Sequence, residues 1–197
     1  MWALTKSIAF AEKADNDVLA YYIDRVKAAL EEKARLEKLV AAEASRPRWK
    51  GRVDSLRCLK GVDVATAADI VFEAGEFARF GNARSFAAWI GLVPSEHSSG
   101  ESVRKGGITK AGNRHLRRAL VESAWHYASC SARPKELSPG QAPDPAARRH
   151  AAKGVRRLVE RRAALLDRGA HKNKANVATA RELACWAWAV GLMAEGA

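Results

Sequence analysis

The sequence predicts a mainly α-helical protein, and three observations lead to this prediction. Apolar residues recur at helical spacing over several long stretches, no segment is rich in strand-forming residues, and four of the six prolines gather in residues 131–145. With 48% apolar residues in a chain of 197, a hydrophobic core can form. We divide the chain into a coiled-coil-like helical arm, residues 1–48, and a helical domain, residues 49–197, with a Pro-rich loop at 131–145.

The first element is a long helix over residues 15–43. Its apolar residues recur at helical spacing among alternating charges: Val18, Ile23, Val26, Leu30, Leu36 and Leu39. Arg46-Pro47-Arg48 ends it. About three heptads are present, so the partner of this exposed helix is either an antiparallel segment of the same chain or a second copy in a homo-oligomer.

The following elements are read from turns and apolar spacing. Short helices are expected at 53–59, 64–74 and 85–90, with Gly61 and Gly75 at their ends and Asp63 as the cap of the second. Residues 92–109 lack helical periodicity and predict a loop, with a short hairpin as a variant of that loop. Longer helices are expected at 111–129, 146–167 and 177–193, the last two after the Pro-rich loop.

The net charge of +12 is unevenly distributed. Residues 103–181 carry 19 Lys or Arg against 5 Asp or Glu, whereas the rest of the chain carries 15 against 17. A neutral body with a strongly cationic C-terminal half indicates a polyanionic partner, and a solvated basic surface is the alternative.

Cysteine usage and hydropathy indicate a cytoplasmic protein without membrane contact. Cys58, Cys130 and Cys185 are far apart and form no C-x-x-C pair, so they are expected to be reduced packing residues. The N-terminus has too short an apolar run for a signal peptide, and Leu183 to Met193 is too short to cross a bilayer.

Residues 56–67 resemble a helix-hairpin-helix unit, in which two helices flank a Gly-containing turn. The backbone amides of such a turn bind a phosphate of duplex DNA, which makes Lys60 and Gly61 candidate nucleic-acid contacts. Asp63 stands where the second glycine of the unit is usual, and a carboxylate there repels phosphate and caps the helix instead. An ordinary helical corner is therefore an equal interpretation.

A Gly/Ser-rich basic loop follows the short helices. Ser98-Ser99-Gly100 predicts a turn with an exposed hydroxyl, and Gly106-Gly107 allows close approach to a phosphate. Arg104, Lys105 and Lys110 would stabilise phosphate charge, and Thr109 would cap the next helix. Composition alone favours a phosphate-binding loop over a nucleophilic one.

Two helices carry dense positive charge. After Asn113, three arginines at i, i+3 and i+4 share one helix face, namely Arg114, Arg117 and Arg118, and we favour nucleic-acid contact over a solvated face. A later helix carries seven cations, which line a nucleic-acid channel or face solvent: Arg148, Arg149, Lys153, Arg156, Arg157, Arg161 and Arg162. The histidines have no metal-binding spacing, so no metal ligands are predicted.

Several segments together resemble one transposase family. They are Leu59–Val62, Phe86–Ser95, Ser98–Gly100, Lys105–Arg114 and Asn176–Leu192, in this order and spacing. They are similar to the C-terminal domain of Piv-type DNA invertases and related insertion-sequence transposases, some of which are bridge-RNA-guided recombinases. The resemblance covers roughly residues 50–193.

The resemblance implies a serine-bearing, DNA-binding domain of a transposase or site-specific recombinase. The nucleophile falls on Ser99, with Ser98 as the alternative, and the partners are DNA and, for guided members, a guide RNA. Mg²⁺ would enter only with an RuvC-like domain that carries an acidic tetrad. Only about fifty residues precede the matching region, which indicates a truncated copy that acts with an RuvC-like partner. The alternatives are a non-catalytic nucleic-acid-binding remnant and a helical interaction protein that uses residues 15–43.

Overall fold

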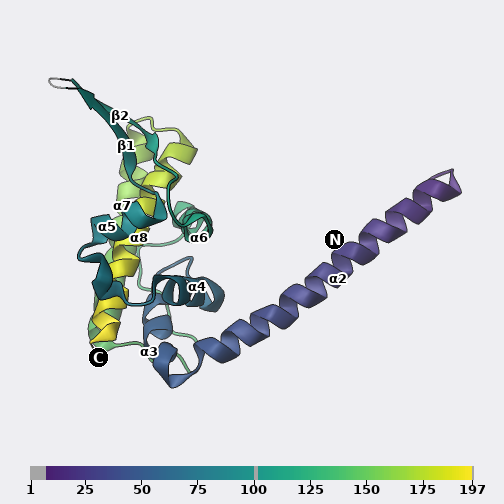
Figure 1. Cartoon of the computed structure of the whole chain (residues 1–197), viewed down its shortest axis with the longest axis horizontal. Coiled ribbons are helices and arrows are strands. Elements are labelled where there is room, and N and C mark those ends of the chain that lie inside the picture. The colour runs from purple at the N-terminus through teal and green to yellow at the C-terminus, as the bar shows by residue number, and fades with distance from the viewer. Residues whose placement is uncertain (1–7, 100–101, 197) are drawn as a thin grey trace. The chain divides into compact units, whose positions relative to one another are not determined.

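The computed structural model describes residues 8–99 and 102–196, and it gives the backbone path alone for residues 96–99 and 102–105. The described part is mainly helical, which confirms the predicted fold class (Figure 1). The chain forms two compact units, residues 1–42 and 43–197. The helices are α2 (Lys13–Ala44), α3 (Pro47–Leu56), α4 (Val64–Ala74), α5 (Ala83–Ile90), α6 (Arg114–Trp125), α7 (Pro145–Asp167) and α8 (Lys172–Glu195).

Helix α2 confirms the long helix expected near the N-terminus. Its start is stabilised by Asn16, whose side chain accepts a hydrogen bond from the Phe10 amide at 2.9 Å. Its surface carries short-range ion pairs such as Glu32–Arg35 and Lys33–Glu37. Large apolar side chains nevertheless stay exposed along it: Val18, Tyr21, Tyr22, Val26, Leu30, Leu36 and Leu39. Among the described residues of the unit 1–42, no other element packs on α2 to bury these side chains.

Helix α8 is the centre of the unit 43–197, since α3, α5, α6 and α7 all pack on it. Two glycines allow this close packing. A Cβ at Gly154 of α7 would lie 2.7 Å from the Trp186 ring, and a Cβ at Gly191 would lie 2.5 Å from the Phe77 ring. The chain therefore buries its core by bringing helix backbones against aromatic rings.

Helices α3 and α4 form the corner that the sequence indicated, but α3 starts earlier than predicted. Helix α3 begins at Pro47, six residues before the expected start, because proline is suited to the first turn of a helix. Helix α4 matches its prediction, and the Asp63 side chain caps it by accepting a hydrogen bond from the Thr66 amide at 2.8 Å. A 3₁₀ turn, Phe77–Phe80, leads to α5.

Residues 94–99 and 102–108 form the short hairpin that the sequence allowed as a variant of the predicted loop. Strands β1 (Pro94–Ser99) and β2 (Ser102–Ile108) are antiparallel and project beyond the helices in Figure 1. Ser98 and Ser99 are the last two residues of β1, so the strand extends into the predicted Ser-Ser-Gly turn. Gly100 lies outside the described residues. The register slips near Ser95, where Gly106 and Gly107 oppose a single residue and form a β-bulge.

Helix α6 begins later than expected and is capped differently. The prediction that it starts near Ala111 with Thr109 as its cap is wrong. Asn113 is the cap, and its side chain accepts a hydrogen bond from the Leu116 amide at 3.0 Å. Lys110 and Gly112 both have positive φ, which is incompatible with a right-handed helix at these positions. After Trp125 the chain continues as a 3₁₀ turn, His126–Ala128.

Helices α7 and α8 confirm the last two helical predictions. Helix α7 starts at Pro145, with Asp144 as its cap. Helix α8 starts five residues earlier than predicted, because its first turn is polar and lacks the apolar spacing used to find it. Across the described residues, none of the helices combines the length and apolarity needed to cross a membrane.

Candidate nucleic-acid interface

A groove of about 790 Å³ lies between the base of the hairpin and the first turns of α8. Its apolar lining comes from both sides, with Leu92, Pro94 and Ile108 facing Val177 and Ala178. Its polar lining includes Lys110, Lys174 and Arg181. No acidic side chain is among the described residues that line it. The groove therefore combines an apolar surface with positive charge.

The groove unites two segments that are about seventy residues apart in sequence. Gly106, Gly107 and Lys110 were candidate residues from the basic loop. Sequence reasoning missed Lys174 and Arg181 of α8, although both belong to the cationic stretch 103–181. The signal was present as charge, but the side of α8 that faces the hairpin is known only from the tertiary packing.

The two glycines of the bulge differ in their surroundings. A Cβ at Gly106 would lie 2.4 Å from Ser95 Oγ, whose hydroxyl donates a hydrogen bond to the Gly107 carbonyl at 3.1 Å. At Gly107 no heavy atom lies within 4 Å of the equivalent Cβ position. Gly106 is thus needed for the hairpin itself, while the space beside Gly107 is open to the groove.

The segment after the hairpin is held tightly against the end of α5. Gly91 and Gly112 both have positive φ, and a Cβ at either would lie 2.0 Å from a carbonyl oxygen of the other segment. The Lys110 amide donates to the Gly91 carbonyl at 3.1 Å, and the Asn113 amide donates to the Trp89 carbonyl at 3.0 Å. This contact sets the position of the hairpin base and of Lys110.

The three arginines of α6 do not share one role. Arg117 is half-buried, and its Nη1 donates to the carbonyls of Ile90 at 2.8 Å and of Ala111 at 3.2 Å. Its guanidinium therefore satisfies carbonyls at the end of α5 and in the following loop. Arg114 and Arg118 are exposed. The two exposed arginines remain available to a polyanion.

Acidic residues from α4 lie against the start of α6, which the local sequence did not reveal. Glu73 accepts a hydrogen bond from the Asn113 side-chain amide and contacts Nδ1 of His115. Asp69 lies 3.8 Å from the other ring nitrogen of His115. The hydrogen bond with Glu73 is the main cause that raises the pKa of His115, and Asp69 adds to it. Asn113 is thus a structural link between α4 and α6 as well as a candidate contact.

The candidate residues at the α3–α4 corner also have intramolecular contacts. Lys60 Nζ donates to the Ser131 carbonyl at 2.7 Å, so it ties the corner to the Pro-rich loop. Gly61 has a positive φ, and a Cβ there would lie 2.3 Å from the Ser123 carbonyl oxygen of α6. With Asp63 capping α4, the corner is explained by packing, and its binding of phosphate stays a prediction.

The candidate nucleophile lies at the far end of the hairpin. In the backbone register Ser99 is paired with Ser102 and Ser98 with Val103, while Arg104 is paired with His97. The side chains of these residues and of Lys105 lie outside the described part of the structure. Thr109 is exposed, and its amide donates to the Val93 carbonyl at 2.9 Å. Among the described residues, no group of three or more His, Cys, Asp or Glu is placed to hold a metal ion.

The fold and this surface define a class of protein: a helical domain that presents cations and open backbone around a groove at the base of a hairpin. Residues 53–138 match the model of the transposase IS116/IS110/IS902 family. Over these residues the chain is therefore similar to the transposases of that family.

The chain also has transposase relatives. A candidate transposase of Sinorhizobium fredii, y4qE, is 38% identical over 147 residues, which are 73% of this chain and 38% of that protein. A family 20 transposase candidate of Pseudomonas aeruginosa is 36% identical over 50% of this chain and 28% of its own length. The transposase for insertion sequence element IS1111A of Coxiella burnetii is 38% identical over 35% of this chain and 19% of its own length. The chain thus spans less than two fifths of each of these relatives.

Proposed function

We propose that this chain is a serine-bearing, DNA-binding domain that acts in the transposition of an insertion sequence. The groove at the hairpin base would hold one strand of a DNA duplex, and Ser99 at the end of β1 would be the nucleophile. The family match over residues 53–138 is the observation that carries the proposal, because it includes both the hairpin and α6. The proposal also includes a relation of this chain to the Piv-type, bridge-RNA-guided branch of the transposase family.

The groove suits the chemistry of a nucleic-acid backbone. Lys110, Lys174 and Arg181 would contact phosphates, while the apolar lining would contact deoxyribose carbons. The open space at Gly107 would let a phosphate approach the backbone. Exposed Arg114 and Arg118 would extend the contact along α6, and Arg104, Lys105 and Thr109 would extend it along the hairpin.

The chemical step would be a transesterification. The oxygen of Ser99 would form a bond to phosphorus as the bond from phosphorus to a deoxyribose oxygen breaks. The serine proton would pass to a base, and the leaving oxygen would take up a proton. Because one phosphodiester replaces another, the same step in reverse would rejoin DNA to a new end. Cations at the phosphate would stabilise the charge of the transition state.

The serine would act together with an RuvC-like domain, whether that domain belongs to the same polypeptide or to a partner. Mg²⁺ would bind to the acidic tetrad of that domain and would polarise the phosphate. This chain would supply the nucleophile and much of the DNA contact.

DNA binding is tested by neutralising the groove. The variant K110Q/K174Q/R181Q should bind duplex DNA more weakly, and the slope of log K against log salt should become shallower by about 0.9 per lost phosphate contact. A matched control, K13Q/R25Q/K38Q, removes the same charge from exposed positions of α2. Equal losses in both variants would show a nonspecific charge effect and would reject the groove.

The nucleophile is tested by single substitutions in β1. With an RuvC-like partner present, S99A should abolish strand exchange and the covalent DNA adduct, and it should leave DNA affinity nearly unchanged. S98A should retain both if Ser99 is the nucleophile. An unmodified chain that binds DNA but forms no adduct under these conditions would instead be a non-catalytic nucleic-acid-binding protein.

The remaining partners are part of the same proposal. The exposed apolar side chains of α2 would pair with a second copy of the helix, and the α3–α4 corner would contact DNA as a helix-hairpin-helix unit. A guide RNA would select the target if the chain belongs to the guided branch. The site of action would be the cytoplasm, which agrees with the free thiols of Cys58, Cys130 and Cys185.

A further inference from the structure

The cations of α7 fall into three environments. Arg157 and Arg161 both form ion pairs with Glu182 of α8, at 2.9 and 2.7 Å. Arg162 is buried beneath the Trp125 ring and donates to the Asn176 side chain at 3.1 Å. The others are exposed: Arg148, Arg149, Lys153 and Arg156. The groove proposal uses none of these exposed cations.

Three of the exposed cations form a row along the outer face of α7. Arg149, Lys153 and Arg156 follow at i, i+4 and i+7, so they lie on one side of the helix. That side is opposite to Ala151, Val155 and the other buried residues through which α7 packs on α8. No described acidic residue forms an ion pair with any of the three, and Glu160 lies one turn beyond the end of the row.

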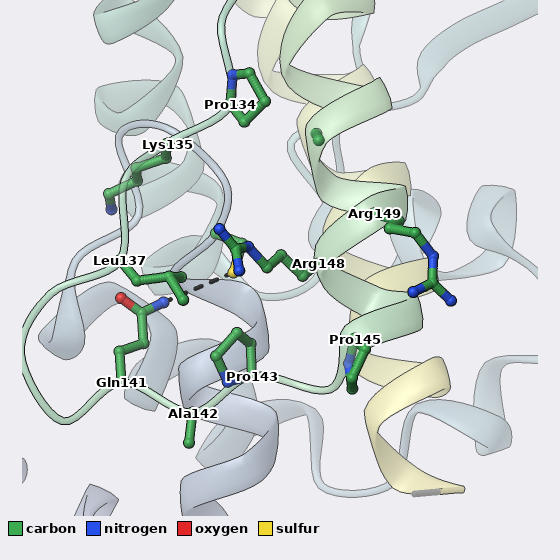
Figure 2. Close-up of a pocket in the computed structure, with 11 residues that line it drawn as sticks. Pro134, Lys135, Leu137, Gln141, Ala142, Pro143, Pro145, Arg148 and Arg149 are labelled. Atoms are coloured by element: carbon green, nitrogen blue, oxygen red, sulfur yellow. Dashed lines mark hydrogen bonds between the residues drawn. The ribbon is translucent and has the colours of Figure 1, made fainter.

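A pocket of about 450 Å³ lies beside the start of this row, between α7 and the Pro-rich loop (Figure 2). Lys135, Arg148 and Arg149 line it, and none of the described residues that line it is acidic. Figure 2 shows Arg148 reaching into the pocket toward Gln141, whereas Arg149 extends along the outer side of α7. Gln141 is buried, and its side-chain amide donates to the Asp54 carbonyl at 2.8 Å, so the floor of the pocket is held in place.

We infer that this row and the mouth of the pocket bind the phosphate backbone of a second DNA duplex, distinct from the DNA in the hairpin groove. The row from Arg149 to Arg156 covers about 10 Å of helix axis, a length over which one DNA strand carries about three phosphates. Like charges at this spacing repel one another on an isolated helix, and three phosphates relieve the repulsion. The row has no aromatic residue for base stacking, which favours duplex over single-stranded nucleic acid.

The row and the groove belong to separate surfaces. The groove lies on α8 where α8 meets the hairpin, and the row lies on the side of α7 that faces away from α8. Between them, Glu182 neutralises Arg157 and Arg161. A domain with two such surfaces holds two duplexes together, which strand exchange between DNA molecules requires. In taking DNA as its partner, this inference rests on the proposed function.

The number of duplexes bound per protomer tests the inference. The full chain is mixed with excess short, dye-labelled duplex, and the mass of each complex is measured by analytical ultracentrifugation. The unmodified chain should bind two duplexes per protomer. R149Q/K153Q/R156Q should bind one, with a loss of affinity at the second site on the order of 100-fold at 0.15 M salt. The groove variant K110Q/K174Q/R181Q should also bind one.

Two control variants test whether a loss of DNA binding comes from lost contacts with the row and not from reduced charge or unfolding. R157Q/R161Q removes two cations from the same helix, but these already pair with Glu182, so this variant should still bind two duplexes. R149K/R156K keeps the charge and should also bind two. Thermal unfolding of each variant checks that the exposed substitutions leave the fold intact.

The possible outcomes are distinct. A single duplex bound by the unmodified chain, or two duplexes bound by R149Q/K153Q/R156Q, overturns the second site and leaves the groove proposal intact. Loss of all binding in that variant also overturns it, because the row and the groove would then hold the same duplex. Failure of the unmodified chain to bind any duplex would reject the proposed function itself.

Discussion

Helix α6 and the outer face of α7 carry similar densities of positive charge, but the fold uses these charges differently. At the start of α6, Arg117 hydrogen-bonds to carbonyls and His115 contacts acids of α4. On α7, Arg149 and Arg156 project away from the core without a described ion-pair partner. A run of arginine in a sequence therefore has no single meaning, and the tertiary neighbours decide whether a cation stabilises the fold or stays available to a ligand.

The largest effect should come from the backbone contact that positions α6. In G112A, a Cβ would lie 2.0 Å from the Trp89 carbonyl oxygen, and alanine would also have to adopt a positive φ of 79°. Together these should lower the free energy of unfolding by about 3 kcal/mol. Urea denaturation measures the loss. The row of exposed cations on α7 contains no glycine, so it has no position of this kind.

A matched control separates the clash from the backbone strain. Gly169, just after α7, has the same positive φ of 79°, but no heavy atom lies within 4 Å of a Cβ placed there. G169A should cost about 1 kcal/mol, from strain alone. Equal losses for G112A and G169A would mean that the contact between Gly112 and α5 contributes little, and the start of α6 would then be no more constrained than the end of α7.

The two helices also show which parts of the fold could be predicted from the sequence. Apolar spacing was enough to predict α2, α4 and α7, because the apolar residues of each helix recur at helical spacing within one continuous stretch of sequence. The start of α6 was misplaced because its cap and the positive φ of Gly112 depend on contacts with α5 about twenty residues earlier. Local capping rules led to Thr109 as the cap, whereas the structure uses Asn113, four residues later.

The candidate site was predictable in part for the same reason. The basic loop gave Gly106, Gly107 and Lys110 of the groove, but Lys174 and Arg181 join them only through the fold. The charge density of the sequence could not show that Arg117 has a structural role and Arg114 does not. The acceptors of Arg117 include the carbonyl of Ile90, which is 27 residues away. Composition thus predicted the kind of partner, and tertiary contacts were needed to select the residues.

Alanine substitution should separate the arginines of α6. R117A removes a half-buried guanidinium from two carbonyls and should cost about 2 kcal/mol of stability. R114A removes an exposed side chain and should change stability by less than about 0.5 kcal/mol, as should R149A on α7. Urea denaturation of the three variants gives the ranking. If R149A lowered stability as much as R117A, the arginines of the two helices would not differ in their contribution to the fold.

Freeing the paired arginines of α7 should strengthen DNA binding. E182Q removes the acid that pairs with Arg157 and Arg161, so two more cations become available between the groove and the row. The slope of log K against log salt should become steeper by up to about 1.8, while stability should fall by less than about 1 kcal/mol because both arginines are largely exposed. Fluorescence anisotropy over a salt series measures the slope. An unchanged slope would indicate that DNA does not approach this part of α7.

The smallest effects should be the pH dependences of two histidines, one on each helix, and they should have opposite signs. The hydrogen bond with Glu73 raises the pKa of His115 above its ordinary value of 6.5, with burial acting against it. Protonated His115 therefore favours the folded state. Its contribution is complete below pH 6.5 and is lost as the pH rises through the raised folded pKa.

His150 of α7 should behave in the reverse way. Burial, and then the charge of Lys153, lowers its pKa below 6.5, and its ring packs 4.6 Å from the Trp186 ring. Because the unfolded chain binds the proton more readily, His150 should reduce stability as the pH falls from above 6.5 through the lowered folded pKa. Thermal unfolding across this range measures both effects. H115Q should remove a gain of stability at acidic pH, and H150Q should remove a loss, whereas shifts of the same sign would contradict the different environments assigned to the two helices.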